Sequence, residues 1–166
     1  MKKTFFLISL LLVTNAFAND DIETFNQLKN LEGKWVGTLN GSDGNSKTIN
    51  LSYSIKSNGS ALLEESNEAG VEMMTIFNLH SDKILSTHYC GAMNRPVSEL
   101  KESSKGNITF ITNQSRSGLD QKKDLFVASW KFNLMPEDDD TFIYSYVVNS
   151  AEGQNVIQTA EMKRVK

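Results

Sequence analysis

The strongest constraint on the fold is an alternation of apolar and polar residues that returns in many short segments of the chain. Residues 49–55, 126–134 and 142–148 each alternate in this way, and turn residues separate such segments. Successive side chains of a strand point to opposite faces of a sheet, so a two-residue period is typical of strands with one buried face. Beyond residue 40 the sequence shows no helical period. We therefore expect an all-β protein.

The number of segments and their connections suggest how the sheet is arranged. About ten strands are expected, nearly all joined by short turns. One short helix precedes them, because Asp20 or Asp21 can cap a segment in which Ile22, Phe25 and Leu28 form one apolar stripe. Closure of the meander removes the exposed edge strands, whereas a β-sandwich needs long crossover connections. We predict an up-and-down antiparallel β-barrel with one short N-terminal helix.

The first eighteen residues have the pattern of a secretory signal peptide. Lys2 and Lys3 precede an apolar run over residues 5–13, and Ala16-Phe17-Ala18 forms an A-x-A cleavage site. The apolar run is too short to span a bilayer. We expect cleavage after Ala18, export to a bacterial periplasm or secretion, and one domain over residues 19–166 with no transmembrane segment after cleavage.

Composition excludes several classes of protein. The net charge of −3 and the scattered lysines leave no basic stripe for nucleic acid. The chain has one cysteine and two histidines, too few for a four-ligand Cys/His zinc site or for an intrachain disulfide. We therefore predict no metal site and no nucleic-acid partner.

One expected hairpin, over residues 71–90, carries both histidines and the cysteine. If Leu79 faces Ile84 across the turn, the antiparallel register continues through three further pairs: Phe77 with Ser86, Thr75 with His88, and Met73 with Cys90. This face is the more apolar one, so it is expected to point inward. His88 and Cys90 would then face the barrel interior.

A second hairpin decides where Glu64 points. Asn58-Gly59 is typical of a type I′ turn, and pairing about it places Tyr53 opposite Glu64 on the inner face. Glu64 and His88 would then lie about 10 Å apart at the backbone, on strands separated by one other strand. A slip of one residue would turn Glu64 to solvent, and both registers remain open at this point.

Some of these residues resemble a known family. The short helix, the Gly33-Lys34-Trp35 opening of the first strand and Arg164 in the last strand are similar to the lipocalin and wider calycin pattern. That resemblance implies that Trp35 closes one barrel end and that Arg164 packs on it. Residues 77–90, with Thr-His-Tyr-Cys, and Asn94-Arg95-Pro96 resemble uncharacterised exported bacterial lipocalin-like proteins, a likeness that implies no activity.

The leading functional hypothesis is a non-enzymatic protein that binds a small apolar or amphiphilic molecule inside the barrel. Arg95, in the loop after Cys90, could meet an anionic head group. No catalytic residue and no cofactor are assigned. The candidate ligand-binding residues are His88, Cys90, Glu64, Tyr53, Met73, Phe77 and Arg95, with Trp130 and Tyr144 as further candidates for the lining.

Two alternatives are kept. One is an enzyme that uses a cluster of Glu64, His88 and Cys90, in which a neighbouring base would favour the thiolate. The other is a haem-binding barrel with His88, or the turn residue His80, as the iron ligand. A buried thiol beside a structural histidine is the simpler interpretation of the His88 and Cys90 pair.

Overall fold

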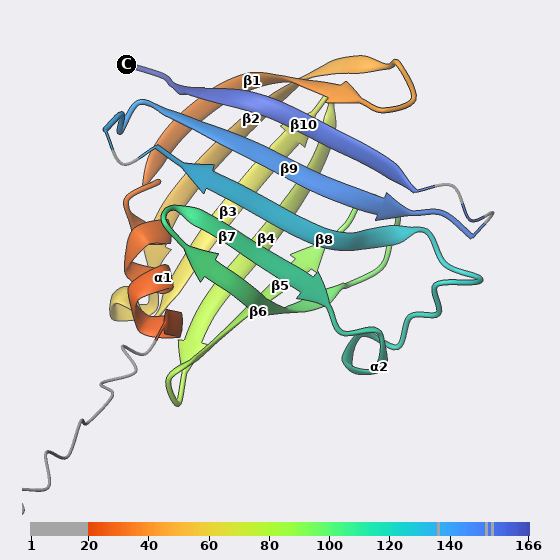
Figure 1. The fold of residues 1–166 in the computed structure, drawn as a ribbon, viewed down its shortest axis with the longest axis horizontal. Helices are drawn as coiled ribbons and strands as arrows, with labels where there is room; N and C mark the ends of the chain where they lie inside the picture. Colours follow the sequence, from red (N-terminus) through yellow and green to blue (C-terminus); the bar gives the residue numbers. More distant parts are fainter. Residues whose placement is uncertain (1–19, 136, 152, 154) are drawn as a thin grey trace, which may run out of the picture.

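Ten antiparallel strands close into a barrel in the computed structural model, which describes residues 20–135, 137–151, 153 and 155–166 (Figure 1). Each strand pairs with the next along the chain, and the first pairs with the last. The predicted up-and-down barrel with a helix before its first strand is confirmed. The proposed signal peptide, residues 1–18, lies outside the described residues. The elements are α1 (Asp20–Lys29), β1 (Gly33–Gly41), β2 (Ser46–Lys56), β3 (Ala61–Glu68), β4 (Val71–His80), β5 (Lys83–Tyr89), β6 (Val97–Ser104), β7 (Asn107–Thr112), α2 (Gln114–Ser117), β8 (Phe126–Leu134), β9 (Thr141–Asn149) and β10 (Val156–Arg164).

The β4–β5 hairpin has the predicted register over most of its length. Three of the four predicted pairs are present: Leu79 with Ile84, Phe77 with Ser86, and Thr75 with His88. The fourth, Met73 with Cys90, is wrong because β5 ends at Tyr89. The Cys90 amide instead donates to the Asn94 carbonyl, 3.1 Å away, and so begins the loop to β6.

The β2–β3 hairpin also has the predicted register, with Tyr53 opposite Glu64. Its turn differs from the prediction. Lys56 and Ala61 form the last pair, so four residues make the loop, and Ser57 and Asn58 both have positive φ. The register survives because lengthening the turn by opening one further pair leaves the partners below it unchanged.

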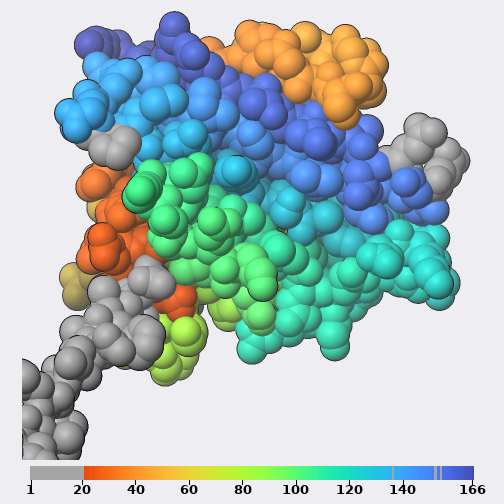
Figure 2. Space-filling view, viewed as in Figure 1, coloured from red at the N-terminus to blue at the C-terminus, as the bar shows by residue number. Residues whose placement is uncertain are grey.

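Helix α1 covers one end of the barrel, where it contacts β2, β4, β5 and β6 (Figure 1). Phe25 and Leu28 are fully buried there, as the predicted stripe requires. Asp21 lies within the helix and pairs with Lys83 at 3.0 Å. In the space-filling view, α1 and the 113–125 segment lie toward opposite sides of the molecule (Figure 2). The end opposite α1, where β3 and β5 end and β4 and β8 begin, is called the mouth.

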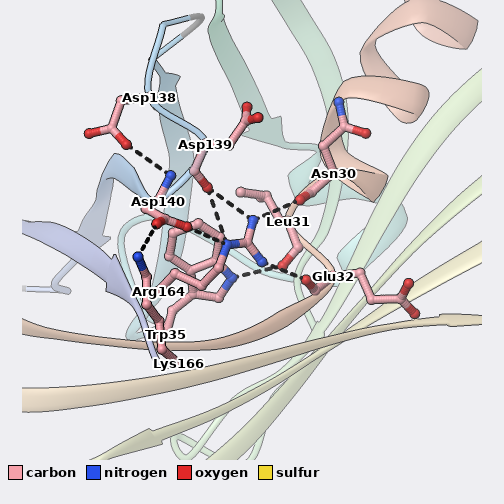
Figure 3. Close-up of polar contacts among 9 residues, drawn as sticks. All are labelled: Asn30, Leu31, Glu32, Trp35, Asp138, Asp139, Asp140, Arg164 and Lys166. Carbon is pink, nitrogen blue, oxygen red and sulfur yellow. Dashed lines mark hydrogen bonds and ion pairs between the residues drawn. The ribbon is translucent and has the colours of Figure 1, made fainter.

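Trp35 and Arg164 meet at the end covered by α1 (Figure 3). The Trp35 indole Nε1 donates to the Leu31 carbonyl at 2.7 Å, and the Arg164 guanidinium lies 4.2 Å from the centre of the indole ring. Gly33, with a φ of +125°, leaves room for this, because a Cβ atom there would come within 3.0 Å of Arg164 Nη1. Arg164 also donates to three backbone carbonyls, those of Asn30, Glu32 and Asp139.

The polar segment after β7 contains the short helix α2. The Asn113 side chain accepts a hydrogen bond from the Arg116 amide at 3.0 Å and so caps the helix start. A side-chain oxygen in this position satisfies a backbone donor that the helix itself leaves free.

Within the described part of the chain, no helix combines the length and apolar character needed to cross a bilayer.

Candidate functional site

A cavity of about 210 Å³ lies inside the barrel at the mouth. Its walls are mostly apolar and come from strands on both sides of the barrel and from the loops beside them. Apolar wall residues include Val71, Met73, Leu125, Phe126, Val127 and Val148. His88, Cys90, Trp130, Tyr144 and Tyr146 also contribute to the lining. The site thus combines an apolar wall with a few polar groups, as small-molecule sites generally do.

Glu64 lies behind the cavity, with 1 % of its surface exposed. The Tyr53 hydroxyl donates to its Oε2 at 2.6 Å, and the Thr75 and Tyr144 hydroxyls reach its Oε1 at 3.0 and 3.4 Å. Burial raises the pKa of Glu64 to about 7, and the three hydrogen bonds act in the opposite direction. This carboxyl therefore changes its protonation state near neutral pH.

Thr75 connects Glu64 to His88. Its Oγ1 lies 3.0 Å from Glu64 Oε1 and 3.0 Å from His88 Nδ1, so one hydroxyl spans the gap between β3 and β5. The β3–β4 and β4–β5 registers place Thr75 directly opposite both residues. Burial lowers the pKa of His88 to about 4, so its imidazole is neutral at pH 7.

Two buried polar atoms of the lining residues are left without a protein partner. His88 Nε2 and Trp130 Nε1 make no hydrogen bond to any described residue. Both residues are buried, with only 2 % of the surface of His88 and 4 % of that of Trp130 exposed. The two rings lie 4.7 Å apart, centre to centre. An unpaired buried donor or acceptor costs about 1–3 kcal/mol. A molecule in the cavity that pairs with both atoms would therefore be stabilised.

A second buried carboxylate lies near the mouth. Glu68 Oε2 accepts a hydrogen bond from the Tyr146 hydroxyl at 2.8 Å and pairs with Lys47 Nζ at 2.7 Å. Burial, followed by the charge of Glu68, raises the pKa of Tyr146, so the phenol stays protonated. Sequence reasoning missed this group, although Glu68 lies on the same strand face as Glu64 and an inward Glu64 implies an inward Glu68.

Cys90 lines the cavity and is half-buried. Burial raises the pKa of its thiol, which disfavours the nucleophilic thiolate. Among the described residues, no hydrogen bond joins Cys90 to His88, and no cluster of three or more His, Cys, Asp or Glu side chains has metal-binding geometry. The local geometry provides no activated cysteine.

The residues predicted to bind a ligand fall into three groups. Met73, His88 and Cys90 line the cavity, as do Trp130 and Tyr144. Glu64 and Tyr53 lie in the hydrogen-bonded network next to the cavity. Two residues lie elsewhere.

Phe77 and Arg95 lie neither in the lining of the cavity nor in the network beside it. Phe77 packs in the core against Phe110 and Phe132, because the barrel interior is filled with side chains at that level. Arg95 is exposed on the loop between β5 and β6. His80, the alternative haem ligand, is exposed at the far end of β4, away from the mouth.

The sequence matches no known family model and no curated protein. The solved structures that the chain is similar to include the following two. A protein of unknown function from the DUF3598 family of Nostoc punctiforme is 11 % identical, with a TM-score of 0.48 over 84 % of this chain and 49 % of that one. A redesigned β-barrel is also 11 % identical, with a TM-score of 0.40 over 82 % of this chain and 93 % of that one. The chain spans about half the length of the Nostoc protein, and no conclusion is drawn from either likeness.

Proposed function

We propose that this protein binds a small, largely apolar molecule carrying one polar group in the cavity at the barrel mouth, and performs no chemistry on it. One observation carries the proposal. His88 and Trp130 line the cavity, and His88 Nε2 and Trp130 Nε1 are buried without a hydrogen-bond partner among the described residues. In the neutral imidazole, Nε2 accepts a hydrogen bond if Nδ1 carries the proton, and the indole N–H donates one. A ligand hydroxyl group that reaches both atoms would satisfy them.

The volume limits the size of the molecule. A dry cavity of about 150 Å³ can hold benzene, and sites for drug-sized ligands span about 300–1,000 Å³. The cavity of about 210 Å³ lies between these sizes. A single substituted ring or a short chain fits this description, with its apolar part against Val127 and Val148. A longer amphiphilic molecule would extend past the mouth.

The N-terminal pattern supports a location for this binding. A cleavable segment over residues 1–18 would place the protein in a bacterial periplasm or outside the cell. The contact of Arg164 with Trp35 beneath a short helix supports kinship with lipocalin-like barrels. Fractionation of cells that express the full chain, with the N-terminus of the exported protein determined by mass spectrometry, tests the first proposal.

Native mass spectrometry of protein purified from the periplasm tests the binding. We expect a retained molecule in the wild type and its loss in Trp130→Phe, which keeps a ring but removes the N–H donor. Trp35→Phe is the matched control, because it makes the same chemical change at the opposite end of the barrel. Spectra without any added mass, together with identical dye or probe binding by all three proteins, would contradict the proposal.

Haem is the second candidate, favoured by the unpartnered His88 Nε2, which is the atom that would ligate iron. The cavity of about 210 Å³ does not fit a macrocycle of drug size or larger, so we do not assign haem as a resident group. Absorption spectra after haem addition test this directly. A Soret band that disappears in His88→Ala but not in His80→Ala would reverse our assignment.

The enzyme alternative receives less support. The hypothesis needs an activated thiol, and burial acts against the thiolate of Cys90. Glu64 and His88 are connected through hydrogen bonds of Thr75, and neither of these bonds involves Cys90. The geometry therefore favours a binding role for the cluster.

A further inference from the structure

We propose that Glu64, Thr75 and His88 form a proton relay that sets whether His88 offers the ligand a hydrogen-bond acceptor or a donor. Uptake of one proton would switch the cavity from binding a hydroxyl group to binding a carboxylate. This inference rests on the proposed function, because it concerns the same cavity.

The starting arrangement has Glu64 ionised. Its two oxygens accept hydrogen bonds from the hydroxyls of Tyr53, Thr75 and Tyr144. Thr75 has one proton, which it donates to Glu64, so its oxygen accepts from His88 Nδ1. The neutral His88 therefore carries its proton on Nδ1 and leaves the lone pair of Nε2 unpaired. Each proton shared between His88, Thr75 and Glu64 therefore has an acceptor.

Proton uptake begins at His88 Nε2, the end of the chain with no protein partner among the described residues. A new N–H bond forms there, the Nδ1–H bond breaks, and that proton moves to Thr75 Oγ1. The original Thr75 proton moves to Glu64 Oε1. The product is a protonated Glu64 that donates to Thr75, a Thr75 that donates to Nδ1, and a neutral His88 with its proton on Nε2. One proton is gained and no buried charge remains on the pair.

The competing site for the proton is Glu64 Oε2. A proton there would be donated to the Tyr53 oxygen, and the Tyr53 hydroxyl would then lose its only acceptor within the described structure. A buried donor without an acceptor costs about 1–3 kcal/mol. Protonation at Oε1 avoids this cost, because Thr75 can turn its own proton toward His88. The position of Thr75 therefore directs the proton into the relay.

Burial, with a smaller effect of a neighbouring charge, keeps the switch near neutral pH. Burial raises the pKa of Glu64 to about 7, and the charge of Glu68 acts in the same direction. Tyr53 and Tyr144 stay protonated, because burial raises the pKa of both well above its ordinary value. The groups facing the relay are Tyr53 from β2, Trp130 from β8 and Tyr144 from β9. Lys47, Glu68, Cys90 and Tyr146 lie nearer the mouth.

The switch changes what the cavity can hold. With the proton on Nε2, His88 and Trp130 offer two N–H donors, which suit the two oxygens of a carboxylate. With Glu64 ionised, a ligand carboxylate would face the Nε2 lone pair and lie near a second negative charge, which is unfavourable. A hydroxyl group suits the ionised state, because it can accept from Trp130 and donate to Nε2.

Isothermal titration calorimetry tests the ligand class. It measures the affinity of the protein for benzoate and for benzyl alcohol between pH 5.5 and 8.5. Both probes have one ring, and benzoate stays ionised over this range. Above pH 7 we expect benzoate affinity to fall about tenfold per pH unit, with one proton taken up on binding, as linkage requires. Benzyl alcohol affinity should not fall. Benzoate binding that is independent of pH would overturn the switch.

Two variants separate the relay from a general effect of burial. Thr75→Val keeps the shape of the side chain but removes the connecting hydroxyl. Glu64→Gln replaces the carboxyl group with a neutral amide of similar shape. In both, benzoate affinity should lose its tenfold dependence on pH. Thr24→Val is the control, because Thr24 is equally buried and bonds Ser103 at the opposite end of the barrel. Loss of the pH dependence in this control would point to a general effect and overturn the assignment.

Nitrogen-15 NMR of the two histidines reads the relay without a ligand. His88 should carry its proton on Nε2 below pH 7 and on Nδ1 above it, whereas the exposed His80 serves as the internal reference. One unchanged tautomer of His88 across this range overturns the relay even if both probes bind. A tautomer change without binding of either probe keeps the relay but overturns the proposed ligand class and function. The two failures are therefore distinguishable.

Discussion

Replacing Glu64 with glutamine should change how the stability of this protein depends on pH. Burial raises the pKa of Glu64 from 4.5 to about 7, so between these values the folded state holds a proton that the unfolded state has lost. The free energy of unfolding contributed by Glu64 therefore falls as pH rises through this range. The group is destabilising when it is ionised in the folded protein.

His88 has the opposite effect. Burial lowers its pKa from 6.5 to about 4, so between these values the unfolded state holds a proton that the folded state lacks. The free energy of unfolding contributed by His88 therefore rises with pH. In the shared range from about pH 4.5 to 6.5, the two contributions cancel in the wild type.

The magnitude follows from the size of the two pKa changes. One proton corresponds to about 1.4 kcal/mol per pH unit, so each group contributes up to about 3 kcal/mol across its range. Glu64→Gln removes one contribution and keeps the other, because burial alone lowers the pKa of His88. The free energy of unfolding of the variant minus that of the wild type should therefore rise by about 3 kcal/mol as the pH increases from 4.5 to 6.5.

Urea unfolding followed by tryptophan fluorescence at pH 4.5, 5.5 and 6.5 measures this difference. Exposed carboxylates with lowered pKa values, such as Asp43 and Asp140, affect both proteins alike and cancel in the comparison. Glu65→Gln is the matched control, because Glu65 is the next residue of β3 and is exposed on the outer face. A variant-minus-wild-type difference that stays constant across the three pH values would refute the reasoning.

Three further predictions concern other parts of the barrel. Trp35→Phe should lower the free energy of unfolding by about 1–3 kcal/mol, because it removes the donor to the buried Leu31 carbonyl; an unchanged urea midpoint would contradict this. Gly37→Ala should destabilise by about 1–3 kcal/mol in thermal unfolding, since its Cβ would lie 2.7 Å from the Glu161 carbonyl oxygen; a stability equal to wild type would show that β1 and β10 separate easily. Iodoacetamide should modify Cys90 slowly at pH 7 and quickly in urea, because burial raises the pKa of the thiol; equal rates in the two conditions would argue for an exposed thiolate.

Much of the barrel could be predicted from local pattern. Alternation identified the strands because residues two apart share a face, and turn residues limited the register of each hairpin. Tyr53 opposite Glu64 and Thr75 opposite His88 are pairs within single hairpins, so no long-range information was needed. The register between β3 and β4, which places Thr75 opposite Glu64, was not predicted, so the role of Thr75 as the connecting group was missed.

The cavity itself could not be predicted in this way. Alternation says that Phe77 and Met73 both point inward, but it does not say at which level the interior is filled. Phe77 meets rings from β7 and β8 and lies in a packed layer, whereas Met73 lies nearer the mouth and lines open space. Which layer is filled depends on side-chain volumes contributed by several strands at once.

Contacts across the barrel interior were decided only by the tertiary structure. Tyr144 and Tyr146 reach Glu64 and Glu68 over about eighty residues of sequence, and Trp130 comes to lie beside His88. Hairpin register fixes neighbours in the sheet, but side chains that meet across a barrel are related by its closure, tilt and stagger. The sequence by itself thus determined that about ten strands follow one another in a meander and which face of the β4–β5 hairpin points inward, and it left the orientation of Glu64 open. Closure determined which inward groups meet, because the strands that carry them are not neighbours in the sheet.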